Sequence, residues 1–136
     1  MKSVTTYIHF DGICHQAMSF YQKCLGGDLQ LIPYPDAASK SPSDPTQKIM
    51  HSQISRAGIS LIMASDGTPG GTWKASNNFS VSIECESIEE IERLFAALGD
   101  KGHVGCPLND MPWGARFGML TDQFGVQWLF NCALAY

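Results

Sequence analysis

Apolar or β-branched residues alternate with polar ones in several short stretches, and two longer stretches carry apolar residues at helical spacing. Alternation over four to eight residues is typical of a strand with one buried face, whereas spacing of three and four residues is typical of an amphipathic helix. Each half of the chain therefore predicts a strand, a helix and three further strands. The expected strands cover residues 4–10, 28–33, 48–56, 58–65, 78–85, 103–108, 116–122 and 125–131.

Both expected helices are marked by an apolar stripe and by glycines at the end. The first stripe consists of Ile13, Ala17, Phe20, Tyr21 and Cys24, and Gly26 and Gly27 follow it. The second stripe consists of Ile88, Ile91, Leu94, Phe95 and Leu98, before Gly99 and Gly102. Ser87 with Glu90 three residues later forms a capping-box pattern at the start of the second helix. One helix against each group of strands predicts an α+β fold.

The two halves repeat each other. One constant shift along the chain places Ile8 on Ile83 and Gly27 on Gly102, and a second, smaller shift places Gly58 on Gly125. The chain is therefore expected to be one domain, residues 1–136, made of two repeats at about 1–67 and 76–132. The eight extra residues of the first half belong to the proline-rich segment 33–48, which we expect to be an exposed, mobile loop that could act as a lid.

Composition and charge exclude several classes of function. Nine basic residues against thirteen acidic ones give a net charge of −4, and no basic cluster occurs, so a nucleic-acid partner is not expected. No apolar run approaches the ~20 residues that span a bilayer, and the first residues lack the apolar stretch of a signal peptide. The five cysteines are scattered without a Cys-x-x-Cys pair. We therefore expect a cytoplasmic protein with reduced thiols and no membrane partner.

Alternation along each strand divides its side chains between two faces of the expected sheet. The apolar set, expected under the helices, is Thr6, Ile8, Phe10, Ile59, Leu61, Met63, Val81, Ile83, Cys85, Val126, Trp128 and Phe130. The small and polar set is Thr5, Tyr7, His9, Ser60, Ile62, Ala64, Ser80, Ser82, Glu84, Gln127, Leu129 and Asn131. Taken alone, this polar face is either a concave ligand site or a solvated sheet face.

Several motifs make the sequence resemble a known family. They are Tyr7-Ile8-His9-Phe10-Asp11-Gly12, Met63-Ala64-Ser65-Asp66, Trp113-Gly114 and Thr121-Asp122-Gln123-Phe124-Gly125-Val126-Gln127-Trp128. With the duplicated order of elements, they resemble the PhnB-like branch of the vicinal-oxygen-chelate superfamily, which includes glyoxalases, extradiol dioxygenases, and fosfomycin and bleomycin resistance proteins. The resemblance covers nearly the whole chain. It implies two βαβββ modules that form cupped mixed sheets, with helices on the convex face, in a homodimer.

Metal-dependent members of that superfamily carry His or Glu at four equivalent strand positions. Carried over through the two shifts, the positions are Thr5, Ile62, Ser80 and Leu129, none of which is an ordinary metal ligand. The usual metal site is therefore expected to be absent, and no cofactor is implied. Some PhnB-like proteins carry a methyltransferase name, but no glycine turn of the dinucleotide or adenosylmethionine type supports that activity in this sequence.

Three interpretations remain open, and the last of them is a dimerisation module that binds no ligand. In the first, a small organic molecule binds in the cup and is held by Tyr7, His9, His51 and Gln127. Trp113 is then either an aromatic wall for the ligand or a plug of the core. In the alternative, His9, His51 and Glu84 form a non-standard metal site of a lyase, isomerase or dioxygenase. Whether any reaction is catalysed stays open. His15 and His103 are interpreted as surface residues, and adjacent Cys14 and His15 cannot face each other on a helix.

Overall fold

The structure is a computed structural model that describes residues 1–35, 44–67 and 73–134. The chain divides into two compact units, Met1–Lys74 and Ala75–Tyr136. The first unit contains β1 (Tyr7–Phe10), α1 (Cys14–Leu25), β2 (Asp28–Pro33), β3 (Ile49–Arg56) and β4 (Ile59–Asp66). The second contains β5 (Val81–Cys85), α2 (Ile88–Leu98), β6 (His103–Met111), β7 (Ala115–Thr121) and β8 (Gln127–Ala133). The predicted order of elements is confirmed.

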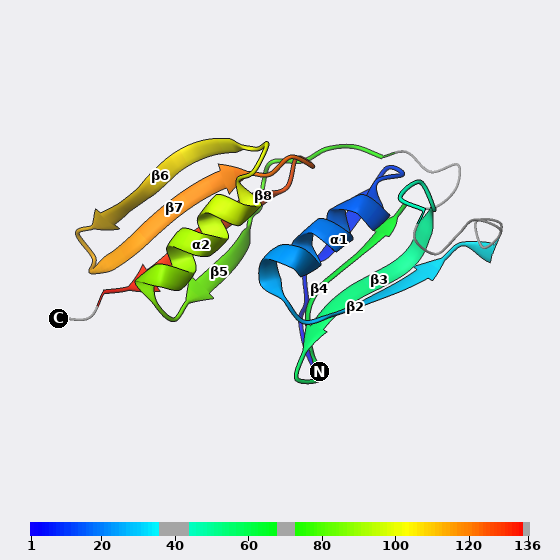
Figure 1. Cartoon of the computed structure of the whole chain (residues 1–136), viewed down its shortest axis with the longest axis horizontal. Helices are drawn as coiled ribbons and strands as arrows, with labels where there is room; N and C mark the ends of the chain where they lie inside the picture. Colours follow the sequence, from blue (N-terminus) through cyan, green and yellow to red (C-terminus); the bar gives the residue numbers. More distant parts are fainter. Residues whose placement is uncertain (36–43, 68–72, 135–136) are drawn as a thin grey trace. The chain divides into compact units, whose positions relative to one another are not determined.

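Each unit is one mixed four-stranded sheet with one helix across it (Figure 1). The strand orders are β1-β4-β3-β2 and β5-β8-β7-β6. The first strand of each unit runs parallel to the last one, and the remaining neighbours are antiparallel. This arrangement confirms the predicted α+β fold with two βαβββ modules. The organisation as one domain with repeats at about 1–67 and 76–132 stays a prediction.

Helix α1 receives its N-terminal support from a distant carboxylate. Its N-cap residue, Ile13, makes no side-chain capping bond. Instead, the buried carboxylate of Asp66, at the end of β4, accepts a hydrogen bond from Cys14 N at 3.0 Å, and its second oxygen accepts one from Ile49 N at 2.9 Å. One side chain thus satisfies an otherwise unpaired helix donor and fixes the start of β3.

His15 is buried in α1, with 9% of its surface exposed, so its interpretation as a surface residue was wrong. A helix buries positions on both sides of its central stripe, and His15 precedes buried Met18 by three residues. The Ser87 half of the predicted capping box of α2 is present, whereas the Glu90 side chain bonds the residue before the N-cap and not Ser87 N. Ser87 Oγ accepts from Glu90 N at 3.1 Å, and the Glu90 carboxylate accepts from Glu86 N at 3.0 Å.

The predicted division of faces is wrong for β4. Ile62 has 1% of its surface exposed and Ala64 is buried, whereas Leu61 is 41% exposed. Residues paired across strands share a face. Ala64 pairs with Ser52, whose hydroxyl lies 3.4 Å from the thiol of Cys14 in α1. Ile62 and Ala64 therefore face the helix, and Met63 faces the opposite side.

A β-bulge explains the error. Ser55 pairs with Ser60 and Ile54 pairs with Ile62, so Leu61 is an extra residue with no directly opposed partner. The β8 ladder has no such insertion. The shift that places Gly58 on Gly125 therefore holds only up to the bulge, and beyond it the match between β4 and β8 moves by one position. A change of one position moves every later side chain to the other face.

A pair of close backbone approaches repeats in the two units. A Cβ built on Gly27 would lie 2.5 Å from the carbonyl oxygen of Ser55 in β3, and one built on Gly102 would lie 2.5 Å from that of Thr121 in β7. The two glycines are equivalent in the two repeats, and β3 and β7 are equivalent strands. At both positions the neighbouring strand leaves no room for a Cβ atom, so a glycine is required. Gly27 also has a positive φ of 86°.

Part of the predicted loop 33–48 lies outside the described residues. On its near side, Tyr34 N donates to Lys48 O at 3.1 Å, and the Tyr34 hydroxyl lies 3.1 Å from the carbonyl oxygens of Asp66 and Gly67. The first bond joins the two ends of the segment to each other, and the Tyr34 hydroxyl joins them to the end of β4. In the described part of the chain, no helix is long and apolar enough to cross a bilayer.

Candidate functional site

The open face of the first sheet, meaning the face opposite α1, carries a polar and aromatic group of side chains. Alternation and register place Tyr7, His9, His51, Gln53 and Met63 on it, because Tyr7 pairs with Met63 and Met63 pairs with Gln53. All except exposed His9 are partly buried. Sequence reasoning missed Met63, because it placed the residue on the helix face.

Tyr7 contacts the other two predicted ligand-binding residues of this unit, His9 and His51. A hydrogen bond of 3.1 Å joins its hydroxyl to Nδ1 of His51. Its ring centroid lies 5.1 Å from that of His9 and 5.7 Å from that of His51. If the phenol donates, Nδ1 of His51 is the acceptor and Nε2 carries the ring proton. In that tautomer, Nε2–H is available to a ligand as a donor.

Trp73 lies beside this group. Its indole Nε1–H donates to the backbone carbonyl of His9 at 2.8 Å. β1 is an edge strand, and the carbonyls of Thr6 and Phe10 accept from Met63 N and Gly67 N on the β4 side. The carbonyl of His9 points the other way, because successive carbonyls alternate along a strand, and the half-exposed indole satisfies it. The sequence carried no signal for this contact.

The second unit contains the other two predicted ligand-binding residues. Gln127 lies on the open face of that sheet, paired with Thr121. Trp113 lies in the turn between β6 and β7, is 65% exposed and contacts Phe117 edge to face at 5.9 Å. Such exposure excludes the interpretation of Trp113 as a core plug. The structure thus brings Tyr7, His9 and His51 together in one unit and places Gln127 and Trp113 in the other.

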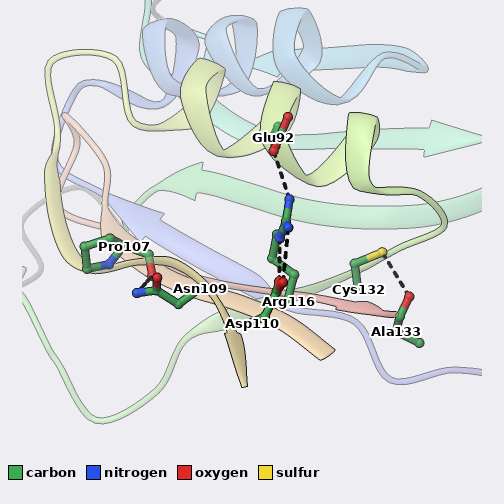
Figure 2. Close-up of polar contacts among 7 residues, drawn as sticks. All are labelled: Glu92, Pro107, Asn109, Asp110, Arg116, Cys132 and Ala133. Atoms are coloured by element: carbon green, nitrogen blue, oxygen red, sulfur yellow. Dashed lines mark hydrogen bonds and ion pairs between the residues drawn. The ribbon is translucent and has the colours of Figure 1, made fainter. Parts of the chain in front are cut away.

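The main charged cluster of the second unit centres on Arg116 (Figure 2). Its guanidinium bonds the Glu92 carboxylate of α2 at 2.9 Å and the Asp110 carboxylate of β6 at 2.8 Å. The hydrogen bond from Arg116 holds the pKa of Asp110 below its usual value and raises that of Arg116. Register with Cys132 places Arg116 on the helix face of the sheet. Two carboxylates already neutralise the guanidinium, so this cluster ties α2 to the sheet and is a poor anion site.

Burial governs the thiol of Cys14. Desolvation raises its pKa to about 12, the bond with Ser52 opposes this, and the Asp66 carboxylate adds to it. Because the thiolate is the reactive form, Cys14 reacts slowly at neutral pH. This agrees with the prediction that Cys14 and His15 do not form a nucleophilic pair.

Two βαβββ units, each a mixed sheet under one helix, define a fold that is shared with solved glyoxalase, bleomycin resistance and dioxygenase proteins. The chain belongs to the PhnB-like 3-demethylubiquinone-9 3-methyltransferase family, whose model matches residues 2–130. The predicted family is therefore confirmed.

Individual relatives are similar over almost their whole length. The chain is 34% identical to Protein YjdN of Escherichia coli K12 over 140 residues, which cover 94% of this chain and 93% of YjdN. It is 38% identical to the solved protein PA1353 from Pseudomonas aeruginosa, with a TM-score of 0.85, and the match covers 99% of this chain and 100% of that one. A putative 3-demethylubiquinone-9 3-methyltransferase, PhnB protein, from Bacillus cereus shares the fold at 24% identity and a TM-score of 0.75, covering 97% of this chain and 100% of that one.

The residues present do not fit the metal site of the superfamily. With the register of β4 corrected, the four equivalent positions are Thr5, Met63, Ser80 and Leu129. None offers the imidazole, carboxylate or thiolate that such sites use. Within residues 1–35, 44–67 and 73–134, no three or more His, Cys, Asp or Glu side chains gather in a group that could hold a metal ion. The alternative metal site was predicted from His9, His51 and Glu84. Of these, Glu84 lies in the second unit, where its carboxylate accepts hydrogen bonds from Asn131 Nδ2 at 3.1 and 3.2 Å.

Proposed function

We propose that this protein binds a small organic molecule in a cupped sheet pocket, without the metal site of its superfamily. The observation that carries the proposal is the hydrogen-bonded Tyr7–His51 pair beside His9 on the open face of the first sheet. Partly buried polar groups beside aromatic rings are what a small-molecule site uses to orient its ligand. For Gln127 and Trp113, which lie in the second unit, a ligand contact stays a prediction.

The side chains at the proposed site also indicate the kind of ligand. None of Tyr7, His9, His51, Gln53 and Met63 is an Asp, Glu, Lys or Arg. Burying an ionised group there would leave it without a partner of opposite charge, at a large desolvation cost. The three rings and the indole of Trp73 favour a planar ligand that stacks. We therefore propose an aromatic or heteroaromatic ligand of low charge, bound by a homodimer in the cytoplasm.

The description of the family names a methyltransferase, but the proposed binding of a small molecule does not require methyl transfer. The proposal covers recognition of the ligand and leaves a reaction to a direct test. Incubation with S-adenosylmethionine and hydroxylated aromatic acceptors, followed by mass spectrometry, would reveal a methylated product. A turnover that depends on Tyr7 would replace the binding role with an enzymatic one.

Nuclear magnetic resonance tests the site directly. ¹⁵N-labelled protein is titrated with a fragment set of phenols, aromatic acids, heteroaromatic amides and phosphonates. We expect the neutral planar fragments to shift the resonances of Tyr7, His9, His51 and Gln53, and Tyr7→Phe to weaken their binding about tenfold. The matched control, His103→Gln, changes an exposed imidazole of the second unit and should bind normally.

Two further measurements decide the rest of the proposal. If no fragment binds, or if all shifts lie away from the open face of the first sheet, the ligand site is wrong. If elemental analysis finds one tightly bound transition metal per chain that His9→Ala removes, the metal-free statement is wrong. Light scattering on the purified protein tests the homodimer.

A further inference from the structure

Two cysteines face each other on neighbouring strands of the second sheet. Cys85 ends β5 and pairs in register with Cys132 of β8, to which β5 runs parallel. Both side chains lie on the helix face, in line with buried Phe130 and Trp128. Cys85 is 7% exposed and Cys132 is 1% exposed. Among the described residues, no other two cysteines are register partners, and all five are free thiols.

This register is compatible with a disulfide. Neighbouring strands lie about 4.7–4.9 Å apart, and disulfides join Cα atoms separated by about 4.4–6.8 Å. Because both side chains point to the same face, rotation about each χ1 angle can bring the sulfurs closer without a change of register. The Cys132 thiol then leaves the carbonyl oxygen of Ala133, which lies 3.6 Å from its sulfur. Cys85 also lies at a strand end, where the backbone can adjust more easily than in the middle of the ladder.

We propose that Cys85 and Cys132 are an oxidation site that closes to a disulfide when the protein meets a peroxide. One thiolate attacks a peroxide oxygen, the O–O bond breaks, and the departing hydroxide takes up the thiol proton to become water, leaving a sulfenic acid. The second thiolate attacks that sulfur, the S–O bond breaks, and a second water leaves. Two thiols are oxidised, and one hydrogen peroxide is reduced to two waters.

The surroundings of Cys85 slow its oxidation. Burial raises the pKa of Cys85 to about 11, and the negative charges of Glu90 and Glu84 and the neighbouring Cys132 add to this, against a smaller opposite effect of Arg93. A protonated thiol reacts slowly with oxidants. The cross-link therefore forms under sustained exposure to peroxide and not through brief contact with air.

The proposed bond would act on an edge of the sheet. β5 is the outermost strand of its sheet, held to the rest by β8 alone. Cys85 is also two residues before Ser87, the N-cap of α2. A covalent bond there would hold both the end of the edge strand and the start of the helix, where local opening is otherwise easiest.

The five cysteines fall in different tryptic peptides, so mass spectrometry identifies the bond without ambiguity. The folded, reduced protein is treated with excess hydrogen peroxide, its remaining thiols are blocked, and it is digested without reductant. We expect one linked species of peptides Ala75–Arg93 and Phe117–Tyr136, two hydrogens lighter than their sum. Reduction should separate the peptides. Amide hydrogen exchange in β5 should slow in the oxidised form.

Matched variants make the test decisive. Cys106→Ser removes a partly exposed thiol and should leave the cross-link unchanged, whereas Cys132→Ala should abolish it. If peroxide converts Cys85 or Cys132 to sulfinic acid without a link, or links Cys106 instead, the proposal is wrong. When the protein is unfolded in urea before oxidation, we expect no specific link, because only the folded register places the two cysteines side by side. The wild-type result stands even if Cys132→Ala does not fold.

Discussion

The phenol oxygen of Tyr7 lies 3.1 Å from Nδ1 of His51, although the two residues are far apart in the sequence. The two strands that carry them are not neighbours, because β4 lies between β1 and β3. The bond therefore crosses the face of an intervening strand and depends on the register of two ladders at once. This relationship gives the open face of the first sheet a fixed polar centre.

Tyr7→Phe tests that centre. The variant keeps the ring and leaves Nδ1 of His51 without its partner, so the free energy of unfolding should fall by about 1 kcal/mol. Urea denaturation measures the change. A double-mutant cycle with His51→Gln should give a coupling energy of about 0.5–1.5 kcal/mol, and additive effects would show that the hydrogen bond contributes nothing to stability.

Asp66→Asn should destabilise the first unit strongly. The carboxylate accepts from both Cys14 N and Ile49 N, and an amide can accept from only one of them while its NH₂ group faces the other donor. One buried N–H group is then unsatisfied, at a cost of about 2–3 kcal/mol. Thermal and urea unfolding measure it. Asp28→Asn is the matched control, because Asp28 is exposed, and an equal loss in both variants would contradict the role assigned to Asp66.

Stability should decrease at alkaline pH through Cys14. Its pKa is raised from 9.0 to about 12 in the folded protein, chiefly by burial. The unfolded thiol therefore loses its proton first, so the contribution to stability is complete below pH 9 and disappears as the pH rises towards 12.

The measurement is a comparison of slopes. Between about pH 9 and 11, the free energy of unfolding of the wild-type protein should fall more steeply than that of Cys14→Ala, by up to about 1.4 kcal/mol per pH unit. The variant also loses packing at every pH, which changes its stability but not the slope. Parallel curves would mean that the thiol ionises equally easily in the folded protein.

Gly27→Ala and Gly102→Ala should both be strongly destabilising. A methyl group at either position would meet a backbone carbonyl oxygen at 2.5 Å, which a side-chain rotation cannot relieve. We expect a loss of at least about 2 kcal/mol in each case. Gly67→Ala is the control, since no atom lies within 4 Å of its added Cβ. Tolerance of either alanine in urea denaturation would argue against this close approach.

The apolar stripes, the capping box of Ser87 and Glu90, and the repeated glycines were sufficient to predict the α+β fold and the order of elements. These features depend on contacts within a few residues, so a linear pattern records them. The positions of Tyr7, His9 and Gln127 on open sheet faces were also predictable, because their strands alternate cleanly. Trp73 was not, since its bond is to the backbone of a residue on a distant strand.

The amino-acid sequence alone determined the duplicated modules, their helices and the family to which the chain belongs. The tertiary structure decided which side of β4 is buried, and with it that Met63 and not Ile62 lies beside Tyr7. Apolar residues occupy both sides of β4, so its composition favours neither face. The extra residue, Leu61, fits only as a bulge against β3, and hydrogen bonding between strands decides where that bulge falls.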